Sequence, residues 1–423
     1  MSDDEIEILP RGPVHASLRP PGSKSITNRA LVCAALAEGR STLSGALDSE
    51  DTRVMIEALA KLGVDIEARL AEAVVEVEGC GGRLPAREGE LYVANSGTTV
   101  RFLAALIGLA EGKFRLDGTS RMRERPIGDL IESLRQLGVE ARAESAGNCP
   151  PVVIRAAGLK GGRATVRGDV SSQFLSGLLL AAPYASQPVT LTVEGELVSQ
   201  PYVAMTLAVM EAFGVEVSQD GLREFRLPRA RYRARPYAIE PDASAASYFF
   251  AAAAILGGDV TVEGLSKTSL QGDVAFVDML ERMGCRVYYG TDQIRVTGGS
   301  LKGITVNMNG ISDTVQTLGA VALFAEGPTT ITGVGHIRHK ETDRIGALAT
   351  ELRKLGASVE ELSDGLRITP GALRGAAIDT YHDHRMAMSL ALVGLRQPRV
   401  VIRDPGCTAK TYPGFWHDLR SLG

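Results

Sequence analysis

Hydrophobic and polar positions along the chain follow a fixed order of periodicities that recurs six times. Each recurrence has a helical pattern, a short β-branched run, a second helical pattern and two alternating strand patterns. The second helical pattern of the first recurrence is clear at Val54, Ile56, Leu59 and Leu62. This order predicts an α/β protein made of repeated β-α-β-α-β-β units.

Two glycine-containing markers set the length of the repeat. Ala-Glu-Gly ends the first helical pattern at residues 37–39, 110–112 and 325–327. A hydrophobic residue followed by glycine ends the second one, where a left-handed glycine is favoured. The second set of glycines, spaced 67–76 residues apart, is Gly63, Gly138, Gly214, Gly284, Gly356 and Gly423. Because both markers keep one period, we expect six units, three in each of two domains.

The sixth unit ends at its glycine, without the two strands that should follow. Two spare strand patterns stand at the other end of the sequence, at residues 6–8 and 14–18. We therefore expect the N-terminal segment to complete the second domain, which would comprise residues 1–21 and 236–423. The first domain, residues 22–235, would be inserted into it. The linkers at 20–22 and 229–236 would form a hinge, with the active site in the cleft between the domains.

Composition and charge exclude several classes of function. The chain has 46 basic and 50 acidic residues and a net charge of −4, so nucleic acid and anionic membranes are not expected as partners. Five scattered cysteines, without CxxC or nearby histidines, indicate neither a disulfide framework nor a metal site. The first residues lack the character of a signal peptide. We expect a cytoplasmic monomer without a cofactor.

Polar clusters stand where the first helix of nearly every unit should begin. Helix N-termini present unpaired N–H groups and a partial positive charge, so several facing one cleft would bind anions. N-terminal capping explains Asp242 and is also an alternative for Asp313. It does not explain the added cations and amides. The clusters are at residues 23–29, 95–101, 171–173, 242–244, 313–314 and 383–385, and further cations lie at 123–125, 340–344 and 408–410.

Ten segments in order give the chain a resemblance, over its whole length, to the 5-enolpyruvylshikimate-3-phosphate (EPSP) synthases. They are PGSKSITNRA (21–30), NSGTT (95–99), RMRERPIG (121–128), DVSSQFLSGLL (169–179), LVSQPY (197–202), DASAASYF (242–249), QGD (271–273), KETDR (340–344), DHRMAM (383–388) and CTAK (407–410). The resemblance implies a two-domain, inside-out α/β barrel. It also implies transfer of the enolpyruvyl group of phosphoenolpyruvate to the 5-hydroxyl of shikimate 3-phosphate, with release of phosphate.

The resemblance also implies a role for individual residues. Ser171, Ser172 and Ser199 would hold the shikimate phosphate, Ser25 and Arg29 its carboxylate, and Tyr202 its ring. The remaining contacts to shikimate 3-phosphate would come from Lys24, Gln173, Asp313, His336 and Lys340. Phosphoenolpyruvate would contact Lys24, Asn95, Gly97, Thr98, Arg125, Gln173, Arg344, Arg385 and Lys410.

Addition followed by elimination needs an acid, a base and cations for the departing phosphate. Glu341 is the candidate acid, and Asp313 with Lys24 the candidate base. His384 and Lys410 would exchange protons with the phosphate, although packing is an equal alternative for His384. The seven cations that the resemblance brings together would repel one another in the empty cleft, which predicts closure on shikimate 3-phosphate binding.

Two positions, His336 and Phe102, depart from the pattern of the EPSP synthase family. His336 replaces a common asparagine and would make affinity fall as pH rises past its pKa. Phe102 leaves sensitivity to glyphosate open.

The related UDP-N-acetylglucosamine enolpyruvyl transferases use a loop cysteine that residues 111–126 lack. A non-catalytic phosphometabolite-binding protein would have lost Lys24, Asp313 or Glu341, and all three are present.

Overall fold

A computed structural model describes residues 4–422 and divides the chain into two compact units. The first domain is Gly22–Ile239, and the second is Met1–Pro21 with Glu240–Gly423. The predicted boundary at 235/236 is therefore four residues too early. Residues 229–236 are predicted as a linker, but strand β14 (Pro236–Ala238), which begins at the end of this stretch, pairs with a strand of the first domain and belongs to it. Gly423, the sixth marker glycine, lies outside the described residues.

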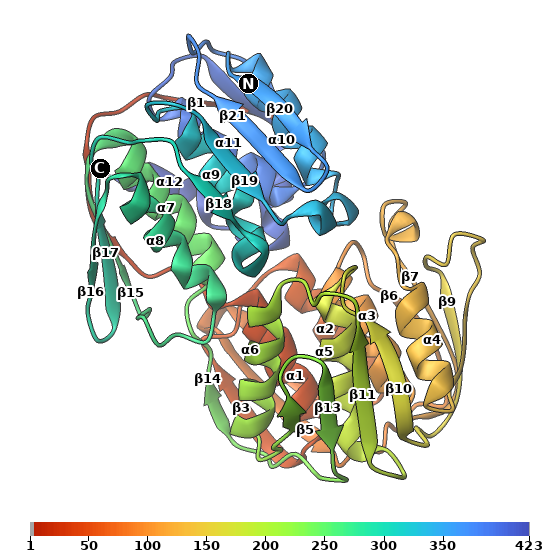
Figure 1. The fold of residues 1–423 in the computed structure, drawn as a ribbon. Helices are drawn as coiled ribbons and strands as arrows, with labels where there is room; N and C mark the ends of the chain where they lie inside the picture. Colours follow the sequence, from red (N-terminus) through yellow and green to blue (C-terminus); the bar gives the residue numbers. More distant parts are fainter. Residues whose placement is uncertain (1–3, 423) are drawn as a thin grey trace. The chain divides into compact units, whose positions relative to one another are not determined.

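The first domain contains three four-stranded sheets of the same design (Figure 1). Besides β14, the strands are β3 (Glu38–Ser44), β4 (Asp65–Arg69), β5 (Val74–Cys80), β6 (Glu88–Tyr92), β7 (Glu111–Asp117), β8 (Glu140–Ala143), β9 (Val152–Ala157), β10 (Gly162–Arg167), β11 (Val189–Glu194), β12 (Ser218–Asp220) and β13 (Glu224–Leu227). The sheet orders are β14-β3-β5-β4, β6-β7-β9-β8 and β10-β11-β13-β12. In each, the first pair is parallel and the other two are antiparallel.

The second domain repeats this design and borrows two strands from the N-terminal segment. Its strands are β1 (Glu5–Ile8), β2 (Val14–Leu18), β15 (Gly258–Glu263), β16 (Arg286–Tyr289), β17 (Gln293–Thr297), β18 (Thr305–Asn307), β19 (Thr329–Thr332), β20 (Ser358–Leu362), β21 (Gly365–Thr369), β22 (Ala377–Ile378) and β23 (Val400–Arg403). The orders are β2-β15-β17-β16, β18-β19-β21-β20 and β22-β23-β1. Since β2 starts the first sheet and β1 completes the last, the prediction for the N-terminal segment is confirmed.

Helices of two kinds alternate along the chain. The first kind is buried on nearly every side, as expected of a helix that is apolar all round. It comprises α1 (Lys24–Leu36), α3 (Gly97–Ile107) and α5 (Ser172–Ala181) in the first domain, and α7 (Ala243–Leu256), α9 (Val315–Ala322) and α11 (His384–Gly394) in the second. Within each domain these three helices pack against one another, and the sheets lie outside them. The predicted inside-out arrangement has this form.

The second kind of helix mostly has one buried face and one polar face. It comprises α2 (Glu50–Lys61), α4 (Gly128–Gln136), α6 (Gln200–Ala212), α8 (Phe276–Met283), α10 (Arg344–Lys354) and α12 (Phe415–Arg420). The marker glycines end such helices in the left-handed region, with φ of +89° at Gly63 and +114° at Gly284. Among residues 4–422, no helix has the length and apolar character needed to cross a membrane.

Candidate active site

In the first domain, the three buried helices begin with the predicted polar clusters. Ser23, Ser96 and Ser171 cap α1, α3 and α5, each accepting a hydrogen bond from a backbone N–H of the first turn. Capping satisfies one N–H of each helix and leaves the other first-turn N–H groups for a ligand. The polar cluster of the first domain therefore combines three helix N-termini with the side chains described next.

Lys24 is the first residue of α1 and forms an ion pair with Asp51 of α2. The Lys24 Nζ atom lies 3.3 Å from Asp51 Oδ2, and the Asp51 side chain is almost fully buried. Asp51 thus holds the ammonium group in place at the N-terminus of α1. The sequence predicted Lys24 as a site residue but not its partner.

Arg29, which is predicted to contact a substrate carboxylate, is buried, and most of its N–H groups already donate to protein partners. Its Nε donates to Thr206 Oγ1 at 2.7 Å, and its two terminal nitrogens donate to the carbonyls of Ser25 and Tyr202. The guanidinium also lies 5.3 Å from the ring centre of Phe102. Burial lowers the pKa of Arg29 to about 10, so the group stays charged. Two of its five N–H groups are left over for a substrate.

Gly97 makes room for an arginine. A Cβ at this position would stand 2.4 Å from the Arg125 NH2 atom and 3.2 Å from Arg101 NH1. Arg125 is held there by hydrogen bonds from NH1 to the carbonyl and side-chain oxygens of Asn95, at 2.8 and 3.2 Å. The bare backbone at residue 97 therefore admits a guanidinium to the N-terminus of α3.

Gly97→Ala should accordingly weaken binding of phosphoenolpyruvate. The methyl group must push the Arg125 guanidinium away from its place, and a lost charge-assisted hydrogen bond corresponds to roughly a tenfold effect. We expect a rise in KM for phosphoenolpyruvate and an unchanged KM for shikimate 3-phosphate in steady-state kinetics. Gly89→Ala in β6, where the added Cβ meets its neighbours at an ordinary 3.6 Å, is the control.

A chain of hydrogen bonds fixes the side chain of Gln173. Gln173 Nε2 donates to Thr98 Oγ1 at 3.1 Å, and its Oε1 accepts from Arg101 NH1 at 2.5 Å. Arg101 in turn donates to the Pro126 carbonyl and lies over the ring of Phe174. Gln173 and Thr98 are thus brought together, and Arg101 is the residue that orients Gln173.

The three predicted phosphate-binding serines lie at helix starts that neighbour each other. Ser171 and Ser172 begin α5, and Ser199 precedes α6, which packs against α5. Ser199 has φ +53° and ψ +44°, a left-handed conformation that is strained for serine. Tyr202, one turn into α6, uses its carbonyl to hold Arg29. These positions suit a phosphate beside two helix N-termini.

In the second domain, five predicted residues and Asp383, which was not predicted as a site residue, form a compact ion-pair cluster of six members. They are Asp313, Lys340, Glu341, Arg344, Asp383 and Arg385. Asp313 Oδ1 contacts Lys340 Nζ at 2.6 Å and Arg344 NH1 at 3.1 Å, and its Oδ2 contacts Arg385 NH2 at 2.7 Å. The capping alternative for Asp313 is wrong, because Thr314 occupies the N-cap position of α9. For Asp242 capping is confirmed, since its Oδ1 accepts from Ala245 N at 2.8 Å.

Arg344 stands at the centre of this cluster with 1% of its side chain exposed. Its guanidinium contacts Asp383 Oδ2 at 2.7 Å and Glu341 Oε2 at 2.8 Å, besides Asp313. Burial lowers the pKa of Arg344, but the surrounding carboxylates, led by Asp383, outweigh burial and raise it above its ordinary value. Burial has the larger effect at Lys340 and lowers its pKa.

This pairing corrects the expectation that the cations repel one another. The ion-pair cluster contains three cations and three carboxylates, and Lys24 is balanced by Asp51 in its own domain. Their charges are largely compensated before any substrate binds. The charge argument for closure therefore does not hold for these four cations, because the order of residues along the chain does not show which carboxylates accompany them.

The remaining predicted residues of the second domain are Lys410, His384 and His336. Lys410 ends the 3₁₀ segment Pro405–Lys410 and is buried. His384 is fully buried, with Nδ1 3.6 Å from Asp383 Oδ1. That environment favours packing over proton exchange with a departing phosphate. His336 lies in the 3₁₀ segment Gly335–His339, four residues before Lys340.

The predicted titration of His336 would fall well below neutral pH. Burial, followed by the charge of Lys340, lowers the pKa of His336 to about 3, so the ring is neutral. Folding favours the neutral ring, whereas the unfolded chain binds a proton below about pH 6.5. Stability should therefore be lost as pH falls. We expect His336→Asn to gain roughly 2–3 kcal/mol relative to the parent between pH 6.5 and 4.5, measured by urea unfolding.

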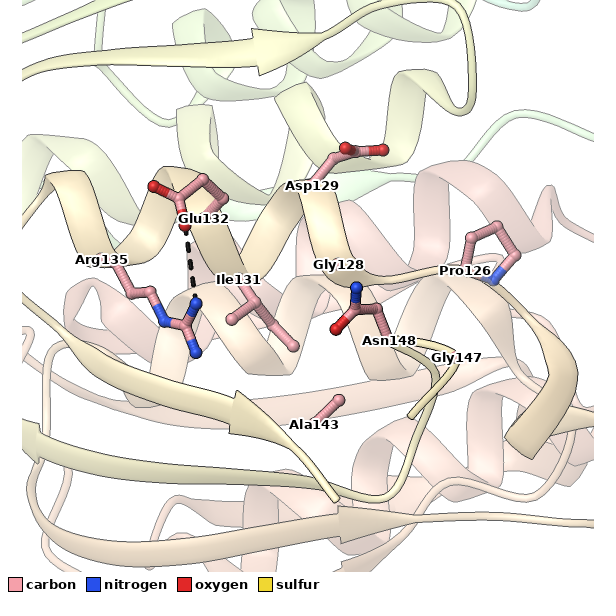
Figure 2. Close-up of a pocket in the computed structure, with 9 residues that line it drawn as sticks. All are labelled: Pro126, Gly128, Asp129, Ile131, Glu132, Arg135, Ala143, Gly147 and Asn148. Carbon is pink, nitrogen blue, oxygen red and sulfur yellow. Dashed lines mark ion pairs between the residues drawn. The ribbon is translucent and has the colours of Figure 1, made fainter. Parts of the chain in front are cut away.

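A pocket of about 390 Å³ beside α4 is lined by none of the predicted site residues (Figure 2). Its charged lining consists of Asp129, Glu132 and Arg135, and the last two form an ion pair at 3.5 Å. Two carboxylates against one guanidinium give a negative lining, which is unsuited to phosphorylated substrates.

Comparison with known sequences and structures identifies the family of this chain. The sequence model of the EPSP synthase (3-phosphoshikimate 1-carboxyvinyltransferase) family matches residues 8–419. The chain belongs to the EPSP synthase family. Two relatives named 3-phosphoshikimate 1-carboxyvinyltransferase are each 50% identical to this chain. The one from Trichormus variabilis aligns over 96% of this chain and 95% of its own, and that from Nostoc punctiforme over 98% of both.

Solved structures confirm the fold of this EPSP synthase family member. EPSP synthase from Acinetobacter baumannii superposes with a TM-score of 0.82 at 28% identity, over 99% of this chain and 98% of the other. The enolpyruvyl transferase NikO from Streptomyces tendae is more distant, with a TM-score of 0.76 at 21% identity over the same shares, and supports the fold alone. The chain is thus a two-domain transferase of the EPSP synthase family.

Residues that support the site of this EPSP synthase family member were not predicted as part of it. Asp51 and Asp383 are buried partners of predicted cations, and Tyr248 accepts from Arg385 NH1 at 3.4 Å. Burial raises the pKa of Tyr248 to about 12, so its hydroxyl stays protonated. Asp383 was visible at a predicted helix start, whereas Asp51 and Tyr248 carry no local signal of their function.

Proposed function

We propose that this chain transfers the enolpyruvyl group of phosphoenolpyruvate to the 5-hydroxyl of shikimate 3-phosphate and releases phosphate. The observation that supports this most is Asp313, a carboxylate held by Lys340, Arg344 and Arg385. Three cations on one carboxylate form a site that a substrate carboxylate can also occupy. Family membership supplies the reaction, and the cluster supplies residues suited to it.

Binding of phosphoenolpyruvate would exchange partners within the ion-pair cluster. Its carboxylate would take the guanidinium groups of Arg344 and Arg385, for which bidentate geometry is suited. Asp313 and Glu341 would then lose partners that now hold them at 2.7–3.1 Å. Both carboxylates would become available for proton transfer only when this substrate is bound.

Binding of shikimate 3-phosphate would use the polar cluster of the first domain. Its phosphate would lie at the starts of α5 and α6, with Ser171, Ser172 and Ser199 as donors. Its carboxylate would meet Ser25 and the remaining N–H groups of Arg29, and its ring would lie against Tyr202. Gln173, already oriented by Thr98 and Arg101, would lie between the two substrates. We propose that both domains contribute to binding, as the sequence predicted.

The chemistry would proceed by addition and elimination. In the first step Asp313 accepts the proton of the 5-hydroxyl while the oxygen of that hydroxyl forms a bond to C2 of phosphoenolpyruvate. Glu341 donates a proton to the methylene carbon in the same step. In the second step the methyl group returns a proton to Glu341, the bond from C2 to the phosphate oxygen breaks, and phosphate leaves with the proton that Asp313 had accepted. Lys24, Arg125 and Lys410 would stabilise the charge on that phosphate.

A coupled assay of phosphate release tests this function. We expect release with shikimate 3-phosphate and phosphoenolpyruvate together, and none with either alone. Release with UDP-N-acetylglucosamine in place of shikimate 3-phosphate would contradict the proposal and favour the related transferase. Binding of shikimate 3-phosphate without release would favour the non-catalytic alternative.

The location and assembly of the enzyme complete the proposal. All five cysteines are free thiols, which suits the reducing cytoplasm. A monomer is proposed because each domain has its own core. Analytical ultracentrifugation at micromolar concentration distinguishes one chain of 44.8 kDa from a dimer.

A further inference from the structure

Two consecutive residues directly before α11 have left-handed backbone conformations. Tyr381 has φ +55° and His382 has φ +53°, and neither is a glycine. Such strain persists only where surrounding groups hold it, and it is frequent beside active sites. The next residue is Asp383, which caps α11 by accepting from Arg385 N at 2.9 Å and also binds Arg344. The contacts that hold Tyr381 and His382 therefore also determine the position of the N-terminus of α11.

Glu351 holds the first of the two residues. The Tyr381 hydroxyl donates to Glu351 Oε1 at 2.6 Å, and the Glu351 side chain is fully buried. Its other oxygen accepts from Asp379 N at 3.2 Å and contacts Lys354 Nζ at 2.8 Å. Burial, together with the Glu351 carboxylate, raises the pKa of Tyr381, so the phenol remains a hydrogen-bond donor. This buried carboxylate has no part in the proposed chemistry.

Glu351 lies on α10, the same helix that carries Arg344. Arg344 begins α10, and Glu351 lies seven residues later, about two helical turns. The helix α10 is therefore tied to the segment before α11 at two points, by Arg344 to Asp383 and by Glu351 to Tyr381. Two points of attachment fix the orientation of α11 relative to α10, which one alone would not.

His382 links the same segment to the one that carries Lys410. Its Nδ1 lies 2.7 Å from Asp404 Oδ2, and Asp404, with φ +48°, directly precedes the 3₁₀ segment Pro405–Lys410. This contact is more exposed than that of Tyr381, so its expected effect is smaller.

We propose that Tyr381 and Glu351 are positioning residues that set the orientation of Arg385 and Asp383 for the carboxylate of phosphoenolpyruvate. His382 extends the same function to the segment of Lys410. The inference rests on the proposed function, because the ligand of Arg344 and Arg385 is assigned there. It adds three residues outside the ion-pair cluster, Tyr381, Glu351 and His382, to those that position the substrate-binding groups.

Tyr381→Phe tests the proposal, because it removes only the hydroxyl that reaches Glu351. We expect KM for phosphoenolpyruvate to rise about tenfold, the usual effect of losing a hydrogen bond to a charged group, with KM for shikimate 3-phosphate unchanged. Glu351→Gln keeps an acceptor oxygen for the hydroxyl and should keep most of the parent KM. A residue with a purely structural role would lower the melting temperature without separating the two KM values.

Tyr289→Phe is the matched control. It also removes a tyrosine hydroxyl from a carboxylate, that of Asp278, but it joins β16 to α8, away from the ion-pair cluster. Equal KM values for phosphoenolpyruvate in both variants would overturn the inference. Absence of phosphate release by the parent chain would instead overturn the proposed function, so the two failures are distinguishable.

A pair of substitutions at His382 provides an independent test. Asparagine tolerates the left-handed region and can donate to Asp404, whereas alanine cannot make that bond. We expect His382→Ala to lower kcat two- to fivefold and His382→Asn to restore it. Equal kcat values for both variants would remove His382 from the proposal.

Discussion

Asp313→Ala should lower the turnover of phosphate release by roughly 10³-fold, within the usual range for loss of a positioned base. Asp313 is the carboxylate that Lys340, Arg344 and Arg385 share, so its removal deletes the proton acceptor and leaves those cations without a common partner. Because freed cations still attract anions, binding of phosphoenolpyruvate should persist. Stopped-flow turnover and equilibrium binding measure the two effects separately.

Asp313→Asn separates the charge from the shape of the side chain. The amide keeps the volume and can accept one hydrogen bond, but it cannot take a proton from the substrate. We expect it to be as inactive as the alanine variant while remaining more stable. Substantial turnover in Asp313→Asn would show that another group is the base.

Arg344→Met should destabilise the fold as well as abolish the reaction. Arg344 is the partner of Asp383, which is fully buried, and of Glu341. Removing one member of a buried ion pair leaves an uncompensated charge and costs about 3–5 kcal/mol. Urea unfolding should show this loss in the free energy of unfolding.

Arg344→Met combined with Asp383→Asn gives the matched test of that explanation. Neutralising Asp383 removes the buried charge that Arg344 had compensated, so the double variant should recover part of the lost stability and none of the activity. Arg367→Met, on an exposed position of β21, should change stability by less than about 0.5 kcal/mol. A double variant no more stable than Arg344→Met would locate the cost elsewhere.

The architecture could be predicted from the sequence because its signals are local and repeated. Each marker glycine ends a helix, and each polar cluster lies at a helix start. Both signals occupy only a few consecutive residues, and their repetition along the chain predicts one repeated unit. The role of residues 4–21 followed from counting strands. The end of the first domain could not be predicted in this way. Residues 236–238 pair with β3, about two hundred positions away, and have no periodicity of their own.

The composition of the site was predictable, but the partners of its residues were not. Lys24, Arg344 and Arg385 stand in motifs, whereas Asp51 and Tyr248 reach them only through packing of separate helices. Arg29 shows the same limit, since its contacts with Thr206 and Tyr202 depend on how α6 lies against α1. Charges counted along a chain give no information on which of them are already compensated in the fold.

The strand borrowed from the N-terminal segment has a consequence for synthesis on the ribosome. Strand β1 pairs with β23, and Glu5 faces Arg403 across that ladder, 398 positions later. At the usual 5–20 residues per second, β1 must wait roughly 20–80 s for its partner, while the first domain is completed in between. A nascent copy of this chain therefore carries β1 without its partner strand through most of its translation, while the backbone N–H and C=O groups of that strand are open to other partners.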